Sequence, residues 1–161
     1  MSAILKFIHR LEDSALVLLV LVMIGLSVSQ IWLRNVNDSG IYWADNALRV
    51  MVLWLAMLGA MIATREHSHI AIDVLSHYLR GVAQKVMAII ASAMTAAVCL
   101  AGAWYSWQFV ALEMEDSYYA FAKVPAWLCE IIIPIGLFII GVRFLFRLAQ
   151  MVLGVPEEEA K

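Results

Sequence analysis

The sequence predicts an all-α integral membrane protein with four transmembrane helices in a single domain, residues 1–161. Two observations predict this class. Hydrophobic residues make up 64% of the chain and charged residues only 15%, which is more apolar surface than a soluble domain of this length can bury. The apolar residues also fall into four stretches, each close to the roughly 20 residues that a helix needs to cross a bilayer.

The four spans are expected at about residues 14–33, 43–64, 86–110 and 127–147. Helices suit these stretches because a helix satisfies its own backbone polar groups, as lipid requires. The first stretch follows Lys6 and Arg10, and its length favours an uncleaved helix over a signal peptide. Pro134 is expected to bend the fourth span because proline cannot donate a backbone hydrogen bond.

The segment between the second and third spans is too polar to cross the membrane. Over about residues 70–80, apolar residues such as Ile70, Val74 and Leu75 recur at helical spacing, with Asp73 and Arg80 among the polar positions. This pattern predicts an amphipathic helix lying in the membrane interface. An ordinary surface loop is the alternative.

The distribution of lysine and arginine predicts the orientation of the chain. Basic residues gather in the N-terminal tail, in the segment after the second span and at the end of the fourth span. The other two loops carry only Arg34 and Lys123, together with an excess of acidic residues. Because cytoplasmic loops are enriched in lysine and arginine, both termini are expected to be cytoplasmic.

The second span begins with an acid and a base, Asp45 and Arg49. These residues are four apart on a helix, so they share a face and can pair. A charge facing lipid near the outer interface is unfavourable, so Arg49 is expected to reach the interface or to pair with Asp45 or a partner. A solute or ion contact is one interpretation, and an anchor between helices or subunits is the favoured one.

Several chemical functions find no support in the sequence. All four histidines fall outside the span interiors, whereas a membrane haem is usually held by histidines on facing helices. Cys99 and Cys129 lack the spacing of a redox pair, and the net charge of -2 gives no basis for nucleic-acid binding. No catalytic set is present, so the chain is not expected to be an enzyme or to hold a cofactor or metal.

Short motifs in order along the chain resemble one family of membrane proteins. Gln30 and Arg34 end the first span in a Gln-x-x-x-Arg pattern. The second span carries Trp43, Asp45 and Arg49, then Trp54 followed by Leu58-Gly59-Ala60, and the next segment carries His69-Ile70 with Asp73; Pro125, Trp127, Pro134 and Gly136 open the last span. Together these motifs resemble the small, DctQ-type membrane subunit of tripartite ATP-independent periplasmic (TRAP) transporters. Asn46 departs from the pattern, where the family often has a second glutamate.

The resemblance implies an accessory subunit in the bacterial inner membrane, surrounded by lipid. Its partners would be a large TRAP membrane subunit, whose scaffold it enlarges, and a periplasmic solute-binding protein, with sodium-driven uptake of an organic acid by the complex. The structural or subunit-interface candidates are Arg34, Trp43, Asp45, Arg49, Trp54, Gly59, His69 and Asp73; the candidate contacts with the binding protein are Glu113, Glu115, Asp116, Tyr118 and Tyr119. A self-contained homo-oligomeric transporter and an anchor subunit of a redox complex remain as alternatives.

Overall fold

The computed structural model describes residues 3–37, 40–66, 82–116, 119–121 and 124–153. The main helices are α1 (Ala3–Asn37), α2 (Ala44–Glu66), α4 (Val82–Asp116) and α6 (Ile132–Leu153), and a short helix, α5 (Ala126–Glu130), precedes α6. Four helical stretches are long and apolar enough to cross a membrane. The predicted all-α fold with four spans is therefore confirmed, whereas the predicted interfacial helix at 70–80 lies outside the described residues.

The helices extend beyond the predicted spans. Helices α1 and α4 each contain 35 residues, which at about 1.5 Å per residue exceeds a hydrocarbon core of roughly 30 Å. The last turns of α4 contain Glu113, Glu115 and Asp116, which the sequence analysis placed in a loop. Charged residues can continue a helix past the edge of the apolar core, so the end of hydrophobicity marks the membrane boundary rather than the helix end.

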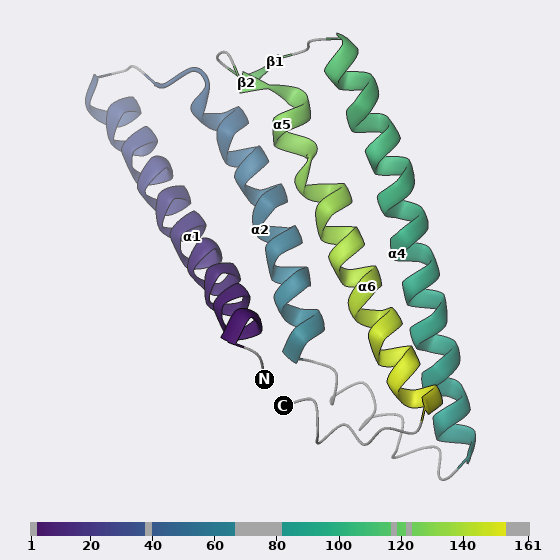
Figure 1. Cartoon of the computed structure of the whole chain (residues 1–161). Coiled ribbons are helices and arrows are strands. Elements are labelled where there is room, and N and C mark those ends of the chain that lie inside the picture. The colour runs from purple at the N-terminus through teal and green to yellow at the C-terminus, as the bar shows by residue number, and fades with distance from the viewer. Residues whose placement is uncertain (1–2, 38–39, 67–81, 117–118, 122–123, 154–161) are drawn as a thin grey trace.

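The four long elements lie side by side in the order α1, α2, α6, α4 (Figure 1). Helix α6 thus lies between α2 and α4, although α4 precedes it in the chain. Helices α2 and α6 run parallel, because Trp54, Met57 and Met61 meet successively later positions of the last span. The result is a row of helices in which α1 and α4 are the two edges.

Helices α4 and α6 pack closely through small residues. A Cβ added at Gly141 would lie 2.9 Å from Cγ of Leu100, and one at Gly102 would lie 3.2 Å from Cδ1 of Leu137. On α4 the buried side chains include Ser92 and Ala96. Small residues allow two helix backbones to approach, which is a main source of helix association in lipid.

Helix α2 packs against α6 through larger side chains. Met61, Ile132 and Ile140 form a buried apolar cluster. Met57 lies over Gly136, where an added Cβ would come within 2.6 Å of its terminal methyl group. The unbranched methionine side chain can fill the irregular space above a glycine, which accounts for this pairing.

Described residues in two of the connections make specific contacts at the end of the row where α2 begins. The side-chain amide of Gln30 accepts a hydrogen bond from the Ile41 N–H at 3.0 Å and donates one to the Ile41 carbonyl at 3.3 Å. Between α4 and α5, strands β1 (Tyr119–Phe121) and β2 (Val124–Pro125) pair antiparallel. These contacts hold the ends of α1 and α2, and of α4 and α5, close together.

The last span is interrupted between α5 and α6. The turn at Ile131 separates the two helices, and the Ile131 N–H bonds to the Trp127 carbonyl at 3.0 Å. Pro134 has no N–H for the carbonyl four residues earlier, at Glu130, so a regular helix cannot continue through this point. The distortion expected from Pro134 thus takes the form of a break one turn before it.

Candidate functional site

At the end of the row where α2 ends, Arg143 connects three helices. Its guanidinium lies 2.7 Å from a carboxylate oxygen of Glu12 on α1. It also donates hydrogen bonds to the Met61 carbonyl and, at 3.5 Å, to the Thr64 hydroxyl on α2. The side chains of Arg143 and Glu12 are only 24% and 12% exposed. A charge held within a membrane helix is expensive unless it is paired, and this arrangement pairs it.

The contact between Glu12 and Arg143 is not predicted by the sequence alone. Arg143 lies near the end of the last span, where an arginine side chain can reach water by extending along the helix. Instead it turns toward α2 and α1. The signal that could have found it is the presence of acids, Glu12 and Asp13, near the start of the first span and of Arg143 near the end of the last span, since an even number of spans puts these two ends on the same side of the membrane.

At the level of the α5–α6 break, Trp54 connects α2 to the last span. Its indole N–H donates a hydrogen bond of 2.9 Å to the carbonyl of Cys129. Trp54 lies well inside α2, ten residues after Ala44, and a half-buried indole N–H needs an acceptor. The interrupted helix supplies that acceptor, so Trp54 acts as a structural contact.

Asp45 and Arg49 lie in the first two turns of α2 and are both exposed. Within the described residues they form no ion pair with each other. Their spacing places them on one side of α2, and Val52 and Ala56, about one and two turns after Arg49 on that side, are exposed as well. This side of α2 is therefore not covered by the other described helices, and lipid or another subunit can contact it.

The other predicted residues have different environments. Arg34 is exposed in the last turn of α1, Trp43 precedes α2 and accepts a backbone hydrogen bond from Ala47 at 3.0 Å, and Gly59 has no atom within 4 Å of an added Cβ. Tyr119 on β1 is 68% exposed. His69, Asp73 and Tyr118 lie outside the described residues.

The acids at the end of α4 differ from one another. Glu115 and Asp116 are exposed. Glu113 is half-buried, and its Oε2 is buried without a hydrogen-bond partner. Within the described part of the chain, no group of three histidine, cysteine or acidic residues is placed to hold a metal ion.

The chain is a multi-pass integral membrane protein, because four of its helices are long and apolar enough to cross a membrane. The contacts of Arg143 and close packing at glycines hold these helices together. The family model for the DctQ component of tripartite ATP-independent periplasmic transporters matches residues 23–154. The chain belongs to this family and is a small permease component of a transporter in the bacterial inner membrane.

Similar proteins from two bacteria agree with this assignment. The C4-dicarboxylate TRAP transporter small permease protein DctQ of Vibrio cholerae is 23% identical over 95% of this chain and 76% of its own length. A putative TRAP transporter small permease protein of Haemophilus influenzae is 27% identical over 67% of this chain and 69% of its length. The sialic acid TRAP transporter permease protein SiaT of Haemophilus influenzae is 28% identical over 47% of this chain, but only over 12% of its own length.

Proposed function

We propose that this chain binds the large membrane subunit of a TRAP transporter and enlarges the static part of that subunit. The observation that carries the proposal is the open row of helices (Figure 1). None of the residues in the most apolar window of α1 is buried, and large side chains such as Leu18, Ile24 and Trp32 are more than half exposed. A row has two broad faces, so a partner helix can pack on one while lipid covers the other.

The contacts within the row suit a static role. The Arg143 cluster fixes the inner end, the Trp54 hydrogen bond fixes the last span at its break, and Gly141 allows close packing at the α4 edge. A transport domain that moves through the bilayer needs a fixed neighbour to move against. A rigid row bound beside the large subunit supplies additional fixed surface.

The proposed reaction of the complex is sodium-driven uptake of an organic acid delivered by a periplasmic binding protein. The names of two relatives refer to C4-dicarboxylate and sialic acid, which are both organic acids. With both termini cytoplasmic, the β1–β2 hairpin and the end of α4 face the periplasm. The exposed side chains of Glu115, Asp116 and Tyr119 would then be available to the docked binding protein, with Glu113 beside them.

Co-purification tests this proposal. A C-terminal tag on this chain, gentle solubilisation and mass spectrometry should recover a larger multi-span permease at equal stoichiometry. Liposomes with both membrane subunits and the binding protein should take up solute in a sodium gradient, and liposomes with this chain alone should take up none. Recovery of the chain alone as a homo-oligomer, or uptake by it alone, would overturn the proposal.

A further inference from the structure

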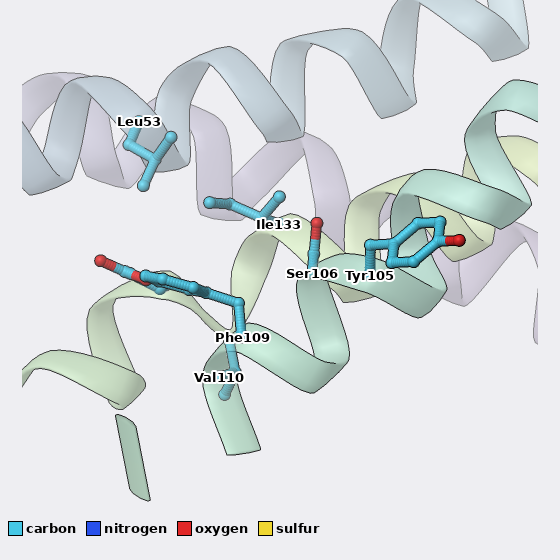
Figure 2. A pocket seen from close by; sticks show the side chains of 7 residues that line it. Leu53, Tyr105, Ser106, Phe109, Val110 and Ile133 are labelled. Carbon is cyan, nitrogen blue, oxygen red and sulfur yellow. The ribbon is translucent and has the colours of Figure 1, made fainter. Parts of the chain in front are cut away.

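One face of the helix row carries a hollow of about 400 Å³ near its outer end. Leu53 of α2 and Ile133 of α6 line it together with Ser106 and Phe109 of α4 (Figure 2). Side chains from α2, α4 and α6 therefore form its walls, and the hollow opens on the surface of the row. Its walls are mainly apolar.

Two acids, Glu130 and Glu113, lie on α5 and α4, and both of these helices contribute to the hollow or stand beside it. Glu130, the last residue of α5, lines it directly. Glu113 is four residues after Phe109 and seven after Ser106, so it shares their side of α4. Its Oε2 is buried without a hydrogen-bond partner, and α4 packs against α5, the helix that ends at Glu130. The hollow thus combines apolar walls with two carboxyl groups at one end.

These carboxyl groups have no counter-charge among the described residues. The ion pair formed by Arg143 lies at the opposite end of the row, and the exposed Arg49 is not paired with either glutamate. Two neighbouring negative charges at the edge of a membrane repel each other and are poorly solvated. A cation that enters the hollow would relieve both effects.

The shape of the hollow indicates the form of the cation. A divalent metal ion would need several oxygen ligands, whereas Leu53, Phe109 and Ile133 present hydrocarbon and an aromatic ring. A lysine or arginine side chain matches both parts, because its apolar stem packs against hydrocarbon while its charged end reaches polar groups nearer the interface. Arginine can also contact two carboxylates at once.

We propose that this hollow receives a lysine or arginine side chain from a transmembrane helix of the large membrane subunit, which pairs with Glu130 and Glu113. The inference rests on the proposed function, because it assigns one contact within the complex between the two subunits. It also identifies which face of the row the large subunit covers: the face on which Leu53, Phe109 and Glu130 lie.

The double variant Glu113→Gln with Glu130→Gln tests the pairing. It keeps side-chain size and removes both charges, so the two-subunit complex should dissociate at least about tenfold more readily, as expected when a desolvated ion pair is lost. The matched control is Glu115→Gln with Asp116→Asn, which removes the same charge from exposed positions on α4; measured without the binding protein, it should leave the affinity between the two membrane subunits unchanged. Unchanged or tighter binding by the Glu113/Glu130 variant would overturn the inference.

A photo-crosslinking amino acid at Phe109 gives an independent measurement in the intact complex. The expected product is a peptide of the large subunit with a lysine or arginine in a membrane-spanning segment. A crosslink only to phospholipid, whose ammonium headgroup carries the same charge, would overturn the inference while the complex still co-purifies. Failure of the wild-type subunits to co-purify would instead count against the proposed function.

Discussion

The guanidinium of Arg143 lies 2.7 Å from the carboxylate of Glu12, and this contact joins α6 to α1 although α2 separates them in the row. Helix α2 takes part through the Met61 carbonyl and the Thr64 hydroxyl. A guanidinium offers five donors in a planar arrangement, so one arginine can bind acceptors on two helices at once. Three spans are thereby fixed relative to one another at this end of the row.

Replacing Arg143 with alanine should destabilise the chain. The change removes the contacts to both neighbouring helices and deprives the mostly buried Glu12 carboxylate of its ion pair with Arg143, so the free energy of unfolding should fall by about 2–4 kcal/mol. Arg143→Lys should recover only part of this loss, because an ammonium group cannot reproduce the planar arrangement of donors. Unfolding in mixed detergent micelles measures both effects.

A double-mutant cycle isolates the pair itself. Glu12→Gln and Arg143→Met, alone and together, should give a coupling energy of at least about 1 kcal/mol, as expected for residues in direct contact. Arg10→Gln, at an exposed position on the same helix, should change stability by less than about 0.5 kcal/mol. Additive effects of the Glu12 and Arg143 substitutions would show that the pair contributes nothing to the fold.

Replacing Trp54 with phenylalanine should lower stability by about 1 kcal/mol, the usual contribution of one hydrogen bond between membrane helices. Phenylalanine keeps most of the apolar packing and removes only the donor to the Cys129 carbonyl. Trp104→Phe is the matched control, because Trp104 is 64% exposed on α4. Thermal unfolding followed by size-exclusion chromatography measures both variants, and an equal effect would rule out a special role for the Trp54 bond.

The same residues show what the sequence could predict. Composition and the lengths of the apolar stretches were enough for the four spans, because these properties depend on each segment alone. Trp54 is recognisable as part of a motif, but its acceptor is 75 positions away and exists because the helix is interrupted near Pro134. The Glu12–Arg143 pair was missed for the same reason: it depends on which spans are neighbours. The position of α6 between α2 and α4 depends on how all four spans pack together, and no single segment of the sequence determines it.

Gly141→Leu should separate α4 from α6. An added Cβ would already lie 2.9 Å from Cγ of Leu100 and 3.4 Å from Cβ of Cys99, and a larger side chain forces the helices apart, which should lower stability by about 1–3 kcal/mol. Gly25→Leu is the control because nothing lies within 4 Å of its added Cβ. If both variants unfold at the wild-type temperature, close packing at Gly141 does not hold α4 in place.

Replacing Arg49 with alanine should affect assembly rather than folding. The Arg49 side chain is exposed and has no ion-pair partner among the described residues, so the stability of the isolated chain should change by less than about 0.5 kcal/mol. If the arginine anchors the large subunit, recovery of that subunit on the tagged chain should fall severalfold. Arg10→Ala, at an exposed position toward the other end of the row, is the control and should leave recovery unchanged.

Uptake kinetics separate the anchor from a transport site at Arg49. Loss of assembled complex reduces the maximal rate of uptake and leaves the KM for solute unchanged, because the remaining complexes bind solute normally. A residue that contacts the solute would instead raise KM while the two subunits still co-purify. The exposed position of Arg49 on the outer part of α2, where a helix of another subunit can reach it, favours the first result. A raised KM with intact assembly would assign Arg49 to the transport path.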